Sequence, residues 1–212
     1  MEVFDLRSVT VSELLRWLEQ GKVLALPTET AYGLVADSTN ASAVCCIYRL
    51  KGRKVGKPLP LICSSLSQVR KFFYMPNMLS QLARRYWPGA LSIQLKVKSK
   101  RSKVKNKKLE AVSCQIQVPT LDNTLVVRVS ANELLRQLAR QLGRPITATS
   151  ANVSGRGELY VGKEVVKQFQ GRRVKPDIII ADGKLPKRKP STIIGIEQGE
   201  VVVLRQGEIH IK

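Results

Sequence analysis

Histidine is almost absent from this sequence: the only one is His210, two residues before the last residue. Ser-His-Asp or Cys-His catalysis and histidine-based zinc sites are therefore not expected. The cysteines supply no substitute, because Cys45 and Cys46 are adjacent, Cys63 and Cys114 stand alone, and no C-x-x-C pair occurs. We interpret all four as small apolar residues on buried elements. Any catalysis must use hydroxyls, backbone amides, carboxylates and basic side chains.

Long apolar runs are also missing. No stretch approaches the roughly 20 apolar residues that a membrane-spanning helix needs. The acidic start of the chain, residues 1–5, lacks the basic and apolar regions of a signal peptide. We therefore expect a cytoplasmic protein with no membrane association. A hydrophobic content of 43% over 212 residues predicts one sizeable core and a single domain, residues 1–212.

Acidic residues are scarce: 16 Asp and Glu face 36 Lys and Arg, which gives a net charge of +20. Such a surplus favours polyanionic company, either nucleic acid or phosphorylated ligands, and does not decide between them. The most basic stretch, residues 96–108, carries eight Lys or Arg and no acid. It predicts a basic loop insertion at about 99–117, which is either merely solvated or an RNA-contacting arm.

What the sequence does contain is an alternation of strand and helix patterns. Helices are expected after the capping box Thr10–Glu13 and over 40–50, 67–73, 78–86, 133–142 and 162–169. Strands are expected over 23–26, 59–63, 91–98, 125–129, 146–149 and 177–181, with a closing hairpin over 191–196 and 200–204. The 91–98 strand alternates with period 2 and should have one wet face. The pattern predicts an α/β fold with an open mixed sheet and helices on both faces.

Polar clusters follow several of these strands, where open α/β sheets place their ligands. Residues 27–34 read PTETAYGL, residues 49–59 carry five cations, and residues 150–155 read SANVSG. A helix end favours only one or two cations in its last turn, so the five suit a triphosphate, with a solvated basic loop as the alternative. Neither a G-x-x-x-x-G-K-[ST] loop nor a G-x-G-x-x-G turn after a strand occurs. Any nucleotide must therefore be held by another cradle.

The set PTETAYGL, KGR, KPL, WPGAL, VRV, SANVSG, PST and LRQG, in this order and at these spacings, resembles the YrdC family. The resemblance runs from about Thr10 to Gly207. It implies a twisted open mixed sheet around a large basic concave cavity. It also implies the activity of an L-threonylcarbamoyladenylate synthase, a nucleotidyltransferase that acts in a tRNA modification pathway.

The reaction implied by this resemblance joins the amine of L-threonine to bicarbonate as a carbamate. The carbamate attacks the α-phosphate of ATP, which gives threonylcarbamoyl-AMP and pyrophosphate. ATP is a substrate, Mg²⁺ accompanies its triphosphate, and no dedicated acidic metal site is visible. A tRNA-modifying threonylcarbamoyl transferase complex uses the product to make N6-threonylcarbamoyladenosine, and tRNA or double-stranded RNA is a further expected partner.

The resemblance also assigns roles to residues. It places Lys51 and Arg53 in catalysis. The predicted ATP-binding residues are Arg53, Lys57, Thr124, Ser150, Asn152 and Arg205. The predicted threonine-binding residues are Thr30, Arg128 and Ser191, with Arg128 pairing with the amino-acid carboxylate.

Two departures from the family pattern stand out. The family usually reads R-V-P where this chain has Arg128-Val129-Ser130, and residues 156–160 read RGELY in place of the usual Ser/Pro/Thr stretch. Two rival interpretations remain. One is an RNA-binding YrdC-like protein without this activity, and the other is a paralogue that forms carbamoyl-adenylate.

Overall fold

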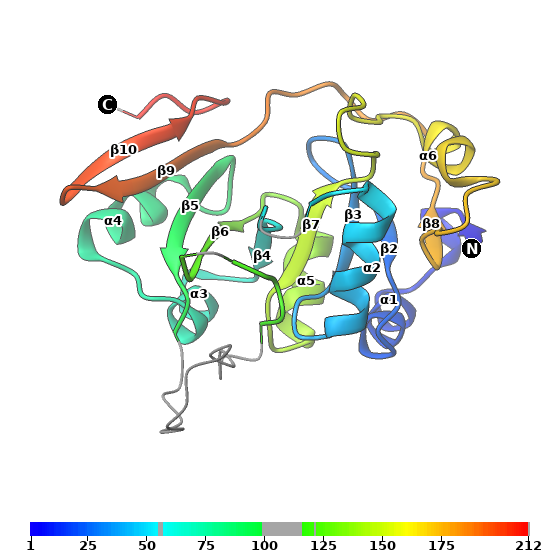
Figure 1. Cartoon of the computed structure of the whole chain (residues 1–212), viewed down its shortest axis with the longest axis horizontal. Helices are drawn as coiled ribbons and strands as arrows, with labels where there is room; N and C mark the ends of the chain where they lie inside the picture. Colours follow the sequence, from blue (N-terminus) through cyan, green and yellow to red (C-terminus); the bar gives the residue numbers. More distant parts are fainter. Residues whose placement is uncertain (55–56, 99–115, 121, 212) are drawn as a thin grey trace.

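A computed structural model describes residues 1–54, 57–98, 116–120 and 122–211 of the chain. Its central feature is a mixed sheet of ten strands with the order β1-β8-β2-β3-β7-β4-β6-β5-β9-β10 (Figure 1). The strands are β1 (Glu2–Phe4), β2 (Leu24–Pro27), β3 (Tyr32–Asp37), β4 (Leu61–Cys63), β5 (Leu91–Lys96), β6 (Thr124–Val129), β7 (Ile146–Ser150), β8 (Ile178–Ile180), β9 (Thr192–Glu197) and β10 (Glu200–Arg205).

Six α-helices accompany the sheet in the described ranges. They are α1 (Val11–Glu19), α2 (Ala41–Lys51), α3 (Leu66–Phe72), α4 (Asn77–Tyr86), α5 (Glu133–Gln141) and α6 (Gly162–Phe169), preceded by a short 3-10 turn at Leu6–Ser8. Local chemistry sets several ends as expected. Thr10 and Glu13 form the capping box of α1, Asn40 caps α2, and Gly52 ends α2 in the left-handed conformation with φ of 57°.

Helices lie on both faces of the sheet, which confirms the predicted α/β fold. Alternate residues of one strand point to opposite faces, so Leu24 and Leu26 of β2 join a core with α1 and α5. Val23 and Ala25 point the other way, into a second core that includes side chains of α2, α3, α4 and α6. The parallel and antiparallel pairings along the sheet confirm that it is mixed.

The principal error of the sequence interpretation lies between β2 and α2. The sequence predicts a strand over 23–26 followed directly by a polar cluster at 27–34, with no second strand before the helix at 40–50. Instead, Pro27 ends β2, and Tyr32 to Asp37 form β3, which returns antiparallel to β2 with Pro27 opposite Tyr32. Only residues 28–31 form the connecting turn. The edge strand β1, which pairs parallel with β8, was also missed.

Three smaller predictions need correction or lie outside the description. The wet face expected for 91–98 is wrong at Ser92, which is buried. Cys45 is exposed and Cys46 half-buried, so the buried interpretation holds only for Cys63, while Cys114 is outside the described residues. Residues 99–115 of the predicted insertion also lie outside them, and Ile116 and Val118 join the core.

No helix in the described part of the chain is long and apolar enough to cross a membrane.

Candidate active site

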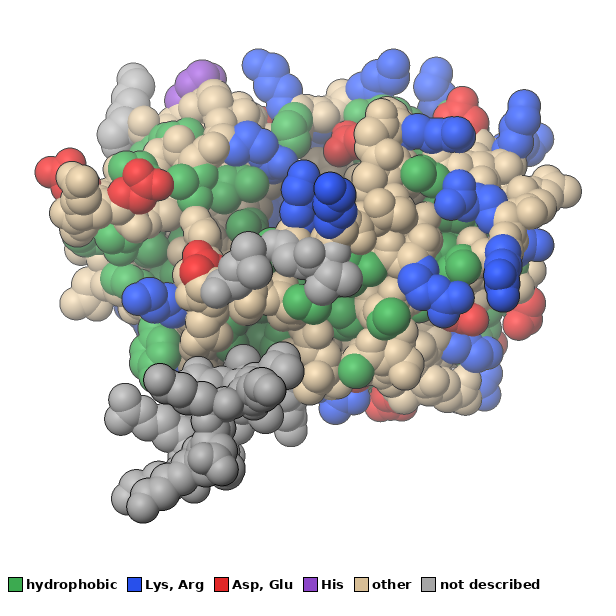
Figure 2. All heavy atoms as spheres, viewed as in Figure 1, with side chains coloured by type: hydrophobic (Ala, Val, Ile, Leu, Met, Phe, Trp, Pro, Cys, Tyr) green, Lys and Arg blue, Asp and Glu red, His purple; other side chains and the backbone are tan. Residues whose placement is uncertain are grey.

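A cavity of about 350 Å³ lies against the sheet, within the range of small-molecule sites. Its walls include residues from distant parts of the chain: Thr30, Arg53, Arg128, Ser150, Ser191 and Arg205. A second cavity adjoins it and shares Arg53, Thr149 and Ser150 with it. The surface is hollowed near the middle of the face in Figure 2, with Lys and Arg side chains around the hollow. The structure thus brings most of the predicted ATP and threonine residues together.

The C-terminal end of α2 supplies the cationic wall between the two cavities. The left-handed Gly52 turns the chain out of the helix, and the Arg53 amide donates to the Tyr48 carbonyl. The guanidinium of Arg53 donates to the carbonyls of Lys57 at 3.0 Å and Pro58 at 3.1 Å. These bonds fix Arg53 on the walls of both cavities, and Lys57 lines the second.

Lys51 plays a different structural part from its cationic neighbours. It is only 3% exposed, and its ammonium donates to the carbonyls of Ser150 at 2.6 Å and Asn152 at 3.0 Å. The Asn152 side-chain oxygen also accepts at 3.0 Å. Burial, with a smaller contribution from Arg53, lowers the pKa of Lys51 from 10.5 to about 8. Lys51 therefore ties the end of α2 to the segment that follows β7 and adds positive charge to the second cavity.

The opposite wall of the first cavity comes from the closing hairpin. Arg205 of β10 donates to the Ser191 carbonyl at 2.7 Å and to its hydroxyl at 3.2 Å. Burial lowers the pKa of Arg205, an effect that Glu158 opposes. A β-carbon on Gly207 would lie 2.2 Å from the Pro190 carbonyl oxygen, so only glycine lets the chain pass this close to Ser191.

The turn between β2 and β3 places Thr30 on the cavity wall. The Thr28 hydroxyl donates to the Ala31 carbonyl at 2.6 Å and accepts from the Thr30 amide at 3.2 Å. This side-chain-to-backbone bonding holds the four-residue turn without a glycine. Thr28 and Thr30 both line the first cavity, and Glu29 lies between them in the sequence.

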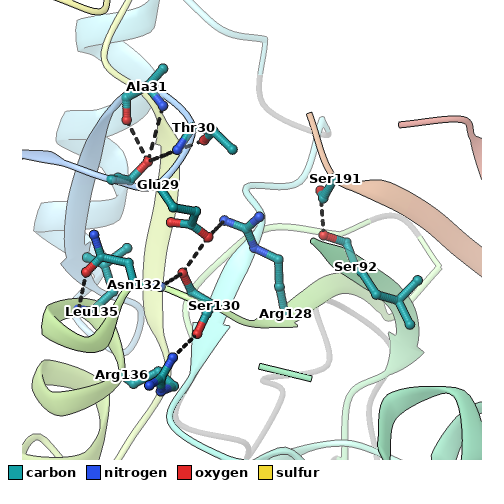
Figure 3. Close-up of polar contacts among 12 residues, drawn as sticks. Glu29, Thr30, Ala31, Ser92, Arg128, Ser130, Asn132, Leu135, Arg136 and Ser191 are labelled. Carbon is teal, nitrogen blue, oxygen red and sulfur yellow. Dashed lines mark hydrogen bonds and ion pairs between the residues drawn. The ribbon is translucent and has the colours of Figure 1, made fainter. Parts of the chain in front are cut away.

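Arg128 reaches the same wall from β6 and carries an ion pair (Figure 3). Its guanidinium lies 2.6 Å from Oε1 of Glu29, and the Ser130 hydroxyl donates to the same oxygen at 2.6 Å. The two paired side chains are 12% and 13% exposed. The other oxygen, Oε2 of Glu29, is buried and accepts no hydrogen bond from any residue that the structure describes.

One predicted site residue stands apart from the others. Thr124 lines neither cavity of the described structure; it lies at the start of β6, where its hydroxyl donates to Asp122 at 2.7 Å. It shares a face of the strand with Val126 and Arg128, which do line the first cavity. Its assignment to ATP stays a prediction.

Ser92 and Glu158 are among the polar residues of the first cavity wall that sequence reasoning overlooked. Ser92 of β5 is buried, and its hydroxyl lies 2.8 Å from that of Ser191. Glu158, from the stretch that departs from the family pattern, accepts from the Tyr160 hydroxyl at 3.0 Å. Ser92 carried no local signal, because it alternates with apolar residues in the same way as Gln94 and Lys96 and so looked solvated, whereas the RGELY departure was the signal for Glu158.

The charged lining suits a phosphorylated ligand better than a metal held by protein alone. Within the described ranges, no three His, Cys, Asp or Glu side chains gather as a metal group. Glu158 is the one carboxylate among the described residues of the first cavity wall. Mg²⁺ is commonly bound by one or two carboxylates together with substrate phosphates. The donor set therefore fits a metal ion that arrives with a nucleotide.

Comparison with known proteins gives a consistent match. The Sua5/YciO/YrdC family model, described as telomere recombination, matches residues 16–207. The threonylcarbamoyl-AMP synthase of Thiobacillus denitrificans is 31% identical over 189 residues, which are 88% of this chain and 90% of the relative. That of Pyrococcus abyssi is 32% identical over 197 residues, 92% of this chain and 53% of the relative.

Solved structures agree. The P. abyssi Sua5 structure complexed with L-threonine aligns with a TM-score of 0.75 and 30% identity over 97% of this chain. This chain spans 57% of that protein. Escherichia coli YciO aligns with a TM-score of 0.74 at 22% identity, over 97% of this chain and 93% of the other, and shows the same fold.

Proposed function

The chain belongs to the Sua5/YciO/YrdC family, and on that premise we propose that it makes threonylcarbamoyl-AMP from L-threonine, bicarbonate and ATP. It is an enzyme, as are its threonylcarbamoyl-AMP synthase relatives, and we assign it to the nucleotidyltransferases. Water and pyrophosphate leave as the by-products. The observation that carries the proposal is the single cavity that joins Arg53, Ser150, Arg128 and Ser191 from four separate segments of the chain.

We assign the cationic side of this site to the nucleotide. Arg53 is fixed by two carbonyls on the boundary of both cavities, and Lys57, Ser150 and Asn152 line the second. Arginine suits this role because its fork binds phosphate oxygens with two hydrogen bonds. Lys51 holds Ser150 and Asn152 in place and contributes charge, and Arg205 faces the nucleotide from the other wall.

We assign the first cavity to threonine. Arg128 would pair with the carboxylate, while the hydroxyls of Thr30 and Ser191 on the same wall would hold the remaining polar groups. The P. abyssi Sua5 complex with L-threonine supports this choice of amino acid.

The proposed chemistry needs alignment and charge stabilisation more than a covalent intermediate, which suits a chain whose one histidine, His210, lines neither cavity. The carbamate oxygen forms a bond to the α-phosphorus as the bond to pyrophosphate breaks. Arg53 and its neighbouring cations stabilise the charge that moves onto the departing phosphates. Mg²⁺ bound to the triphosphate would add to that stabilisation, with Glu158 as the carboxylate within the cavity wall.

The direct test is mass-spectrometric detection of threonylcarbamoyl-AMP after incubation with ATP, bicarbonate and threonine, together with pyrophosphate release. Release must depend on both threonine and bicarbonate. Arg53→Ala should reduce it at least about 100-fold, because it removes a charge from the phosphate site. Arg140→Ala, which removes an exposed arginine on α5, is the matched control and should stay within about twofold.

The rival interpretations give different results in the same assay. Release that ignores threonine but responds to carbamoyl phosphate would indicate a carbamoyl-adenylate-forming enzyme. Tight binding of tRNA or duplex RNA with ATP left intact would indicate a binding protein. We expect the product to pass to a tRNA-modifying transferase complex in the cytoplasm.

A further inference from the structure

The ion pair beside the threonine cavity is organised by a residue that the family pattern does not supply. Ser130 stands where the family usually has proline, and its hydroxyl bonds the carboxylate of Glu29, 101 positions away in the sequence. Proline has no side-chain donor, so it could not make this bond. The bond therefore requires the Ser130 side chain.

The direction of each hydrogen bond in this network is fixed. The backbone N–H of Asn132 can only donate, and it donates to the hydroxyl oxygen of Ser130 at 3.1 Å. The Ser130 proton is then directed to Glu29 Oε1, a charge-assisted bond of 2.6 Å. Asn132 is itself the N-cap of α5, with its side chain accepting from the Leu135 amide at 3.1 Å. Figure 3 shows this chain of contacts from the start of α5 to Arg128.

The backbone of Ser130 is held as firmly as its side chain. Arg136 of α5 donates to the Ser130 carbonyl at 2.5 Å. Ser130 is completely buried, so water does not compete for its bonds. Helix α5 thus anchors Ser130, and Ser130 anchors one oxygen of Glu29.

The unpaired oxygen of Glu29, Oε2, indicates that this carboxylate serves function rather than stability. A buried acceptor without a partner costs about 1–3 kcal/mol, and native structures keep few of them. Glu29 keeps Oε2 in this condition among the described residues while Oε1 takes both of its bonds. Both bonds thus go to Oε1, the oxygen that contacts Arg128. Of the two residues in the ion pair, Arg128 is the one that lines the cavity.

We propose that Glu29 is a positioning residue for amino-acid recognition: held by the Ser130 hydroxyl, it sets the guanidinium of Arg128 on the cavity wall. The proposal rests on the proposed function, in which Arg128 meets the amino-acid carboxylate. It adds that the affinity for threonine depends on a hydroxyl and a carboxylate that lie behind Arg128.

The test is a double-mutant cycle on the threonine site. Glu29→Gln should raise the KM for threonine about 10-fold, because the guanidinium loses the charge that orients it. Ser130→Ala should raise it about threefold. The double variant should match Glu29→Gln, since Ser130 acts only through Glu29. In all three variants the KM for ATP should stay within about twofold of the parent value.

Ser80→Ala is the matched control. Ser80 of α4 is also buried and also bonds an arginine, Arg70 of α3, at 2.7 Å, and neither residue lines either cavity. It should leave both KM values unchanged. Threonine binding measured by calorimetry gives a second readout that does not need product formation. If Glu29→Gln does not fold, Ser130→Ala alone still decides the proposal through its selective effect on threonine.

Two results would overturn the positioning role while the proposed function stands. One is a threonine-dependent parent enzyme whose KM for threonine is unmoved by these changes. The other is a double variant whose effects simply multiply. A parent protein that neither binds threonine nor releases pyrophosphate would instead contradict the proposed function, and the positioning role with it.

Discussion

Two carboxylate–arginine pairs lie at opposite ends of β3, and they are built differently. At the far end, Asp37 accepts from Arg144 through Oδ2 at 2.9 and 2.8 Å and from Thr39 through Oδ1 at 2.9 and 2.7 Å. Both carboxylate oxygens of Asp37 therefore accept hydrogen bonds. At the cavity end, Glu29 takes two bonds on one oxygen and none from described residues on the other. The satisfied pair serves the scaffold, and the incomplete pair belongs to the site.

The largest effect that separates the pairs is on activity. Arg128→Ala should lower kcat/KM for threonine about 100-fold or more, because a charge-assisted contact to the substrate carboxylate is lost. Arg144→Ala should keep kcat/KM within about threefold, since Arg144 contacts neither cavity in the described structure. Initial rates at saturating ATP measure both. Equal losses in the two variants would remove the distinction.

The next effect is on stability, where the Asp37–Arg144 pair should matter more than the Glu29–Arg128 pair. Asp37→Ala leaves Arg144 without its partner and should lower the free energy of unfolding by about 3 kcal/mol, at the low end for buried pairs because Arg144 is 33% exposed. Urea denaturation measures this loss. The KM for threonine of the folded variant should not change, and a shift as large as that of Glu29→Gln would contradict the scaffold role.

A third test uses pH at the cavity end. Burial lowers the pKa of Lys51 from 10.5 to about 8, so between these values the unfolded chain binds more protons than the folded one. Stability from this residue therefore rises with pH, by about 3 kcal/mol across the window. Lys51→Met should lose this rise in urea titrations, whereas Asp37→Ala should retain it. A parent-like rise in Lys51→Met would show that another group causes it.

The smallest effect concerns the wall opposite Arg128. Ser92→Ala removes one hydroxyl bonded to Ser191, whose carbonyl and hydroxyl also accept from Arg205. Because Arg205 still holds Ser191, the KM for threonine should rise only about twofold. Steady-state kinetics would resolve this from the 10-fold effect of Glu29→Gln. A larger change would mean that Ser92 itself contacts the amino acid.

Much of the fold could be predicted because its signals are local. The capping box at Thr10, the N-cap Asn40 and the left-handed Gly52 each mark a boundary within a few residues. Strand β3 was missed because its turn, residues 28–31, is closed by threonine hydroxyls rather than by Gly or Asn. Its residues therefore looked like part of a ligand loop.

The residues that line the site could be predicted, but the hydrogen bonds between them could not. Family motifs brought Arg53, Ser150, Ser191 and Arg205 into one set, and the cavity contains all four. The bond between Ser130 and Glu29 crosses 101 positions, and no local pattern reports such a contact. The hydrogen bonds of the Lys51 ammonium were equally hidden, because all of its acceptors lie about 100 positions away, on Ser150 and Asn152.

The order in which the cavity walls appear along the chain has a consequence during synthesis. The wall begins at Thr28 and is completed only by Arg205 on β10, one of the two edge strands of the sheet. A nascent chain on the ribosome therefore lacks part of its pocket until the closing hairpin has emerged and paired with β5. Turnover at this cavity therefore cannot begin until residues up to Arg205 have been synthesised and the hairpin has folded, so translation itself delays the onset of activity.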